Sequence, residues 1–313
     1  MQEWNDKYNS FNSDIKGATY YEQYLSIAEW KEGKRKAPLP PVEISMDIAS
    51  ICQLKCRHCN FGKYFENERE MRIMPREHIF DLLKFLSDWK NKTLGICWGG
   101  GGESTLNPAI ADSLFLSKQL GLENSIATNG INFDDKLIEI SAMTCRWIGV
   151  SIDAATEKTY NTNRRGNYFN IAIKNIEKLV KEVNKNRYNN DIGFKYLLFD
   201  YNQHEIFEAC KLAKSLGVRD FHIRPADFSH QGVKDKISNP YNIELIEEEF
   251  SKCHTIEDDN FRVFTIVHKF NKDFTPKKKF SQCYASPLCL QITPEGNLFL
   301  CPDTRNIEFY KLG

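Results

Sequence analysis

The stretch Cys52-Gln-Leu-Lys-Cys56-Arg-His-Cys59 places three cysteines at intervals of four and three residues, directly after an apolar run. Cysteine occupies 10 of the 313 positions. The chance that a given cysteine is followed by cysteines at these two intervals is therefore about one in a thousand. The spacing is suggestive by itself, and the segments that follow it strengthen the signal.

Three thiolates on one short loop suit a centre of soft metal ions, because cysteine sulfur favours iron–sulfur and zinc sites. Three such ligands can bind three irons of a cubic 4Fe–4S cluster and leave the fourth iron open for chemistry. A structural zinc needs a fourth ligand, and the nearby His58 is too close in sequence to complete a tetrahedron. We therefore favour a 4Fe–4S site at Cys52, Cys56 and Cys59, with zinc and inert thiols as the alternatives.

Composition indicates a soluble globular protein with one large α/β domain, or one domain with a small appendage. Hydrophobic residues make up 41% and charged residues 27% of the chain, which is ordinary for this class. Lys+Arg and Asp+Glu are 42 each, so charge gives no reason to expect a nucleic-acid or membrane partner. There is neither an apolar run of the ~20 residues that a membrane helix needs nor a secretory signal pattern. Ten cysteines in such a chain indicate reduced thiols and a cytoplasmic location.

The first 41 residues are predicted to form an arm that packs on the main domain. One amphipathic helix is expected over 20–31, with an apolar side made of Tyr21, Tyr24, Leu25, Ala28 and Trp30. The arm ends in a basic run and a proline-rich breaker, and neither carries chemistry that the sequence can assign.

From residue 42 onward, short apolar strands alternate with helices. Strands are expected at 42–48, 93–98, 124–128, 147–152, 193–199 and 220–223, and helices at 76–89, 107–120, 134–143, 170–184 and 203–215. This alternation predicts parallel strands joined by right-handed crossovers. Six units are too few for an eight-stranded barrel, so we expect an α/β fold with a partial, curved barrel of the (β/α)6 TIM-like type. An open doubly wound sheet is the alternative.

Three features together resemble the radical S-adenosylmethionine (radical SAM) superfamily over roughly residues 42–228. They are the cysteine motif after the first strand, a Gly-Gly-Glu after the second, and Ser151-Ile-Asp153 after the fourth. The resemblance implies that the open iron chelates the amino and carboxylate groups of S-adenosylmethionine (SAM). Reductive cleavage of SAM would then give a 5′-deoxyadenosyl radical that abstracts hydrogen from a substrate. It also implies an electron donor of the flavodoxin or ferredoxin type.

The resemblance assigns cofactor-binding roles to several residues. Gly101, Gly102 and Glu103 match the motif that approaches the methionine amino group, since glycines let the backbone come close to a ligand. The alternative for these glycines is a flexible turn. His58 stands where the family usually has an aromatic residue near adenine.

Ser151 and Asp153 match a position that binds ribose hydroxyls, with a helix N-cap pair as the alternative. Other polar residues at or near strand ends could reach the cofactor carboxylate or the substrate, although solvated polar side chains are the commoner case. They are Thr128, Asn129, Arg164 or Arg165, Lys195 and Arg224.

A second cysteine pair lies near the C-terminus. Cys283 and Cys301 flank a predicted hairpin over 288–300 with Gly296 at its turn. This segment resembles the opening of the auxiliary-cluster domains called SPASM and twitch, where two such cysteines ligate an additional 4Fe–4S cluster. Further cysteines of those domains are missing here. We therefore expect a truncated version of a longer enzyme, and the alternatives are a cluster that borrows Cys253, Cys289 or another ligand, or no auxiliary cluster.

The domain organisation expected from these patterns is an arm over 1–41, a radical SAM core over 42–228, a connecting segment over 229–280 and a partial SPASM/twitch-like segment over 281–313. Cys97, Cys145 and Cys210 are expected to be core thiols. The favoured function is oxidation or cross-linking of a peptide, a protein side chain or a small sugar-like molecule. The alternative is a cluster- or zinc-stabilised binding or redox-sensing protein without turnover.

Overall fold

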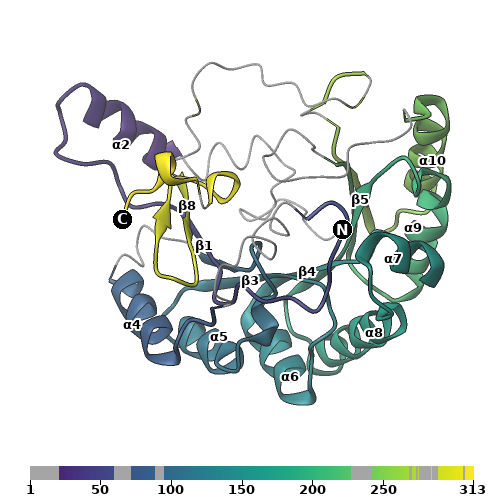
Figure 1. Ribbon diagram of the computed structural model, residues 1–313, viewed down its shortest axis with the longest axis horizontal. Helices are drawn as coiled ribbons and strands as arrows, with labels where there is room; N and C mark the ends of the chain where they lie inside the picture. Colours follow the sequence, from purple (N-terminus) through teal and green to yellow (C-terminus); the bar gives the residue numbers. More distant parts are fainter. Residues whose placement is uncertain are drawn as a thin grey trace.

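One curved sheet of nine strands organises the molecule (Figure 1). The computed structural model describes residues 21–59, 72–88, 95–226, 241–267, 270–272, 274, 283, 288–305 and 307–313. The strands are β1 (Glu43–Met46), β2 (Gly95–Trp98), β3 (Glu123–Thr128), β4 (Cys145–Ser151), β5 (Asp191–Leu198), β6 (Asp220–Pro225), β7 (Arg262–Thr265), β8 (Cys289–Ile292) and β9 (Leu298–Phe299).

The strand order confirms the partial barrel. The sheet runs β7-β6-β5-β4-β3-β2-β1-β8-β9, and β1 to β7 are all parallel. A doubly wound sheet reverses its order at a switch point, whereas β1 to β7 follow one another in one direction without a reversal. The alternative is therefore wrong. Since β7 and β9 form the two edges, the sheet does not close.

Helices cover the outer side of the sheet. They are α4 (Arg76–Ser87), α5 (Ile110–Gln119), α6 (Asp135–Thr144), α7 (Glu157–Arg164), α8 (Phe169–Asn186), α9 (Ile206–Ser215) and α10 (Ile243–Thr255). Figure 1 shows them as an outer arc around the strands. The expected helices and strands of the core are present. The helices α7 and α10 and the strand β7 were not predicted from the sequence.

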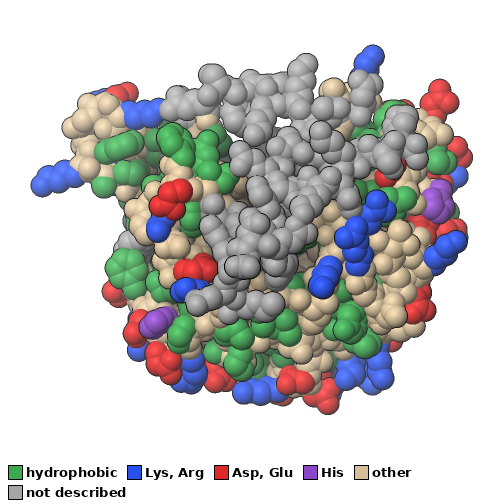
Figure 2. All heavy atoms as spheres, in the orientation of Figure 1, with side chains coloured by type: hydrophobic (Ala, Val, Ile, Leu, Met, Phe, Trp, Pro, Cys, Tyr) green, Lys and Arg blue, Asp and Glu red, His purple; other side chains and the backbone are tan. Residues whose placement is uncertain are grey.

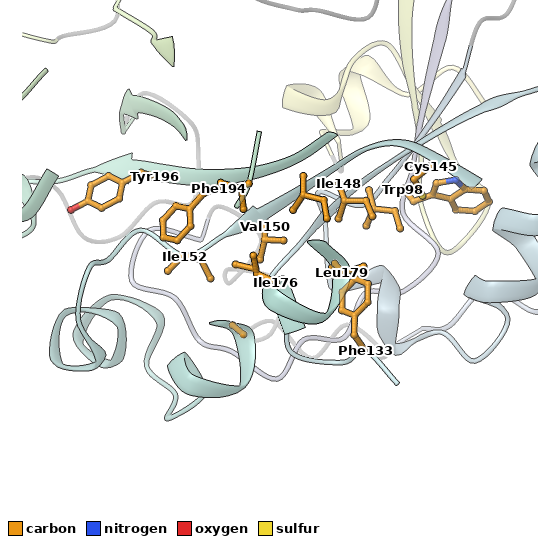
Figure 3. Packing of buried hydrophobic residues seen from close by; sticks show 14 of the residues in the cluster. Trp98, Phe133, Cys145, Ile148, Val150, Ile152, Ile176, Leu179, Phe194 and Tyr196 are labelled. Atoms are coloured by element: carbon orange, nitrogen blue, oxygen red, sulfur yellow. The ribbon is translucent and has the colours of Figure 1, made fainter. Parts of the chain in front are cut away.

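The two faces of each strand have different environments, because successive side chains point to opposite sides. On β4, Ile148 and Val150 are fully buried and lie beside Ile176 and Leu179 of α8 (Figure 3). The opposite, concave face of the sheet, called the inner face below, is polar. It carries Gln291, Ser45, Cys97 and Ser125 in one register, and Ser151, Lys195 and His222 in another.

The helix of the N-terminal arm, α2 (Tyr21–Lys31), is present, but its predicted apolar side is wrong. Trp30 is 48% exposed and Leu25 46% exposed, whereas Gln23, Ser26 and Ile27 are buried. Ile27 packs with Val42 and Leu288 in a small separate cluster. The arm therefore contacts both the start of β1 and the segment before β8 through the face that the sequence pattern did not select.

The predicted C-terminal hairpin is present as β8 and β9, which pair antiparallel. In addition, β8 pairs parallel with β1, which extends the sheet beyond the predicted core. Among the described residues, no helix is long and apolar enough to cross a bilayer. Side chains of both charge signs are interspersed around the rim of the molecule (Figure 2).

Candidate cluster and cofactor site

Cys52, Cys56 and Cys59 lie on the loop that follows β1, and all three are partly buried. The backbone N–H of Cys59 donates to the carbonyl of Cys56 at 3.2 Å, which closes a tight turn. The N–H of Arg57 donates to the carbonyl of Asn163 at 3.0 Å. The loop is therefore anchored to α7 as well as to β1.

Two of the three thiols accept contacts from nitrogen donors of distant segments. Asn129 Nδ2 lies 3.7 Å from Cys52 Sγ, and Arg164 Nη1 lies 3.7 Å from Cys56 Sγ. Burial raises the pKa of the Cys52 thiol to about 12. It also raises the pKa of Cys56, although the Arg164 guanidinium acts in the opposite direction. Donors aimed at sulfur favour the thiolate form, which is the form that ligates a metal.

The arrangement of the thiols fits a cluster better than a single zinc ion. Among the described residues, no three His, Cys, Asp or Glu side chains converge closely enough to hold one metal ion. An iron–sulfur cluster does not need such convergence, because each thiolate binds a different iron. The residues present therefore fit a 4Fe–4S cluster.

A buried ion pair stands beside the cysteine loop. Arg164 Nη2 lies 2.5 Å from Asp153 Oδ2, and the two side chains are 8% and 0% exposed. Asp153 has φ 59°, in the left-handed region, where Asp is among the more tolerated residues. Arg164 Nε is buried without a hydrogen-bond partner among the described residues. An orphaned guanidinium N–H at this position fits the carboxylate of a bound cofactor.

Asn163 connects the loop to the ends of β4 and β5. Its Oδ1 lies 2.9 Å from His58 Nδ1 and accepts from the Tyr201 hydroxyl at 2.7 Å, while its Nδ2 donates to Asp153 Oδ2 at 3.3 Å. Since Oδ1 only accepts, the proton of the neutral imidazole belongs on Nδ1. Burial lowers the pKa of His58 to about 4, and its ring lies 4.7 Å from that of Phe199. Contact between His58 and adenine stays a prediction.

Glu103 clamps the ends of β2 and β3 together. Its Oε1 accepts from the Thr105 hydroxyl at 2.7 Å and the Thr128 hydroxyl at 2.7 Å, and its Oε2 accepts from the Asn129 N–H at 2.8 Å. The side chain also caps the short 3-10 helix Ser104–Leu106. Burial raises the pKa of the carboxyl, and these donors oppose that effect. Glu103 therefore has a structural role, and its contact with the cofactor ammonium stays a prediction.

The glycine run approaches the end of β1. A Cβ on Gly101 would collide with the Asp47 carboxylate, and one on Gly102 would lie 2.8 Å from the carbonyl oxygen of Ile51. The N–H of Gly101 donates to Asp47 Oδ1 at 3.0 Å. The glycines are thus needed for close packing on the cysteine loop, which disfavours the flexible-turn alternative.

The C-terminal segment reaches the same place. Arg305 Nη1 lies 3.2 Å from Asp47 Oδ2, and Arg305 Nη2 donates to Gln291 Oε1 at 3.0 Å. Burial raises the pKa of Asp47 and the Arg305 guanidinium opposes that rise. A residue near the end of the chain therefore supports the loop that holds the glycines.

Ser151 is the last residue of β4 and pairs with Lys195, and its hydroxyl has no hydrogen-bond partner within the part of the chain that the structure describes. The N-cap alternative for Ser151 and Asp153 is wrong, because the side chain of Thr156 caps α7. Asp153 uses its carboxylate on protein donors, including the Leu197 N–H at 2.8 Å. Ribose binding by these two residues stays a prediction.

The cysteines outside the loop differ in environment. Cys283 is exposed and Cys301 partly buried, and Cys301 Sγ accepts from the Asp303 N–H at 3.3 Å. Cys253 is fully buried, and its Sγ contacts the carbonyl of Ile206 at 4.0 Å, so it is a core thiol and not a borrowed cluster ligand. Cys289 Sγ faces Glu43 Oε1 at 3.7 Å.

The core-thiol prediction holds for two of its three cysteines. Cys145 and Cys210 are buried in the apolar core. Cys97 is only partly buried and belongs to the polar inner face. Burial raises the pKa of its thiol to about 11, and a hydrogen bond with Ser125 opposes that rise.

Several hydrogen-bonding residues that join these groups carry no recognisable pattern in the sequence. Asn163 and Tyr201 belong to no motif, and Gln53 accepts from Asn129 Nδ2 at 3.1 Å. Asn202 Nδ2 donates to the carbonyl of Asp153 at 3.0 Å and helps to fix its unusual backbone. Of these residues, Gln53 alone lies within the cysteine motif, and that position was the only sequence signal for a role at the site.

Comparison with known proteins agrees with this geometry. The family model described as the radical SAM superfamily matches residues 46–213. GTP 3′,8-cyclase from Nautilia profundicola is 21% identical over 270 residues, which cover 82% of this chain and 80% of that protein. An S-adenosylmethionine-dependent nucleotide dehydratase from a Thermoplasmatales archaeon is 28% identical over 113 residues, or 36% of this chain and 38% of the relative.

Solved structures share the fold. Streptococcus suis SuiB bound to S-adenosylmethionine superposes with a TM-score of 0.69 at 17% identity, covering 97% of this chain and 69% of that one. Native anSMEcpe with bound AdoMet gives a TM-score of 0.64 at 16% identity, covering 87% of this chain and 78% of that one. The family match covers more than half of the chain and contains the cysteine loop, the glycine run and Asp153. The chain belongs to the radical SAM superfamily, and it is an enzyme whose cofactors are a 4Fe–4S cluster and S-adenosylmethionine.

Proposed function

We propose that the chain is a radical SAM enzyme of the SPASM or twitch kind that oxidises or cross-links its substrate after hydrogen abstraction. The single observation that carries the site assignment is the convergence of Arg164 on both Cys56 Sγ and Asp153 Oδ2. One buried side chain thereby joins the cysteine loop to the end of β4. The remaining features, namely Asn129 at Cys52 and the glycine run against the loop, support the same location.

When bound, the cluster and SAM would supply the one-electron chemistry that removes a hydrogen atom from the substrate. The protein's own residues bind and orient. Arg164 Nε and the Ser151 hydroxyl, which have no partners in the described structure, would hold the cofactor carboxylate and a ribose hydroxyl. Asp153 holds the guanidinium of Arg164 in place. Glu103, Thr128 and Asn129 would position the backbone beside the methionine amino group.

The names of relatives support two substrate classes. The curated relatives include GTP 3′,8-cyclases and nucleotide dehydratases. Among the similar structures, SuiB is bound to its precursor peptide SuiA and anSMEcpe to the Cp18Cys peptide. We therefore propose that the substrate is a small molecule or a peptide.

An auxiliary 4Fe–4S cluster at Cys283 and Cys301 is part of the proposal. Burial raises the pKa of the Cys301 thiol, and the charge of the Cys283 thiol adds a smaller rise, which supports a site shared by the two. Iron analysis of a variant with Cys52, Cys56 and Cys59 all changed to alanine tests this directly. Roughly four irons per chain would remain if the auxiliary cluster forms, and none would remain if the cysteine loop holds all the iron.

Electron paramagnetic resonance of the reduced, anaerobically reconstituted protein tests the central site. We expect a reduced-cluster signal that changes when SAM is added, because the proposed site would hold SAM against the cluster. Cys56→Ala should abolish this response. Cys210→Ala removes a thiol from the apolar core, so it serves as the matched control and should retain the response. An SAM-insensitive signal in the unmodified protein would refute the proposed site.

The electron donor is proposed to be a small redox protein of the flavodoxin or ferredoxin type in the cytoplasm. Reduction of the cluster by a purified flavodoxin system, followed by absorbance under anaerobic conditions, tests this proposal. Failure of both donor types to reduce a cluster that dithionite reduces would contradict it.

A further inference from the structure

The inner face beyond the cofactor residues carries two cations on adjacent strands. In the register of β4, β5 and β6, Lys195 lies between Ser151 and His222, and Arg224 is paired with Leu197. Alternate residues share a face, so Lys195 and Arg224 project from the same inner face as Ser151. The residues flanking Lys195, Phe194 and Tyr196, point to the opposite side and are buried in the apolar core.

The surface below Lys195 is closed by an indole ring and a carboxyl. The ring of Trp147 folds over Gly149, where a Cβ would collide with it. Trp147 Nε1 donates to Asp220 Oδ2 at 3.2 Å, and the Asp220 carboxylate covers Gly193. Lys195 Nζ lies 5.8 Å from the Trp147 ring centroid. The ammonium therefore rests on top of a filled layer and faces the same end of the sheet as the cysteine loop.

The two cations lack an anionic partner in the described part of the chain. Within these residues, Lys195 Nζ and the Arg224 guanidinium make no hydrogen bond or ion pair. Other cations near the site are paired, as Arg164 is with Asp153 and Arg305 with Asp47. Enclosing an unpaired charge is costly, so an unpaired Lys195 with a second cation beside it requires an explanation. Burial lowers the pKa of Lys195, and the nearby charge of Arg224 lowers it further.

We propose that Lys195 and Arg224 together bind an anionic group, a carboxylate or a phosphate, of the substrate. This inference rests on the proposed function, because it places the substrate on the inner face beside the cofactor. An arginine fork suits both kinds of oxyanion, and a lysine adds a point charge. The adjacent Asp153 does not neutralise the pair, since its carboxylate is already bound by Arg164.

The cofactor carboxylate is a poorer candidate for these two cations. Arg164, with its unpartnered Nε, already stands beside the cysteine loop, and it comes from α7. Lys195 and Arg224 come from β5 and β6, farther along the sheet. The two sets of cations therefore divide the inner face into a cofactor part and a substrate part.

Titration calorimetry on the anaerobically reconstituted, SAM-loaded enzyme tests the proposal without turnover. Inorganic pyrophosphate is the probe for a phosphate and glutarate the probe for a carboxylate. At least one probe should bind, and Lys195→Gln or Arg224→Gln should weaken it about tenfold. Lys211→Gln, on the outer surface of α9 and paired with Glu208, is the control and should leave binding unchanged. Arg224 is exposed, so its variant is expected to fold even if the Lys195 variant does not.

Each outcome decides the proposal. Binding of pyrophosphate alone would identify a phosphorylated substrate, and binding of glutarate alone a carboxylate one. If neither probe binds, or if the variants bind as the unmodified enzyme does, the proposal is wrong. If the variants weaken SAM binding instead, the cations serve the cofactor and the proposal is also wrong. Failure of the proposed function would look different, since SAM would remain uncleaved while the anion still bound.

Discussion

Arg164 and Asp153 form a buried ion pair in which Nη2 and Oδ2 are 2.5 Å apart. The pair joins α7 to the end of β4 and holds the guanidinium against Cys56. A charge removed from such a pair leaves its partner buried and uncompensated, which costs far more than breaking a surface pair. Stability and cofactor binding should therefore both depend on it.

Asp153→Asn should lower the free energy of unfolding by about 3–5 kcal/mol, because Arg164 loses its counter-ion inside the protein. Asparagine tolerates the left-handed backbone at this position, so backbone strain should not contribute to the measured loss of stability. The control is Asp112→Asn, which breaks partly exposed pairs with Arg76 and Lys136 and should cost no more than about 1 kcal/mol. Urea denaturation measures both. Equal losses in the two variants would contradict the account.

Gly102→Ala should destabilise the cysteine loop, since the added methyl meets backbone oxygens that cannot move away easily. We expect a lower iron content and a lower melting temperature than in the unmodified protein. Gly121→Ala is the comparison, because Gly121 has φ +79° but open space around it, and its cost is limited to about 1–2 kcal/mol of backbone strain. Normal iron content in Gly102→Ala would show that the cysteine loop tolerates a greater distance from the glycine run.

Arg305→Ala should leave Asp47 buried without its cation, at a cost of about 3–5 kcal/mol. Because Asp47 also accepts from the Gly101 N–H, the glycine run should loosen and SAM should bind about tenfold more weakly. Lys311→Ala changes a cation of the same segment that forms no ion pair among the described residues, and it should have little effect. Unchanged SAM affinity in Arg305→Ala would limit the role of Arg305 to stability.

Asp220 should make stability depend on pH. Burial raises its pKa from 3.8 to about 7, so between these values the folded protein holds a proton that the unfolded chain has released. That stabilisation is present below the unfolded pKa and is lost as pH rises through 7. Between pH 5 and 8 the loss should be about 3 kcal/mol. Asp220→Asn keeps an oxygen acceptor for Trp147 and should flatten this dependence in thermal melts. Parallel curves for the two proteins would refute the assignment.

The sequence was sufficient to predict the curved parallel sheet, because every second strand residue, on the side that faces the helices, is apolar. Ile148 and Val150 are examples. The sequence was insufficient to predict helices made mostly of polar residues. The helix α7 has a polar sequence, Glu-Lys-Thr-Tyr-Asn-Thr-Asn-Arg. Its Asn163 contacts His58, which lies 105 positions away. Such contacts depend on tertiary packing and leave no periodic pattern in the chain.

The roles of individual site residues divide in the same way. The spacing of the three cysteines is enough to indicate their chemistry, because ligands on one short loop need no distant partner. The sequence does not reveal that the carboxylates of Glu103 and Asp153 accept hydrogen bonds from other groups of the protein. The predicted apolar side of α2 was wrong for a related reason. Gln23 and Ser26 are buried through tertiary contacts that the helical periodicity of the sequence does not indicate.

The most direct test of the central claim is chromatography for 5′-deoxyadenosine after anaerobic reconstitution with iron and sulfide and reduction with dithionite in the presence of SAM. The account predicts that the nucleoside forms in the unmodified protein and in Cys210→Ala, and is absent in Cys56→Ala. A protein that carries zinc and leaves SAM intact, or a Cys56→Ala variant that still forms the nucleoside, would contradict it.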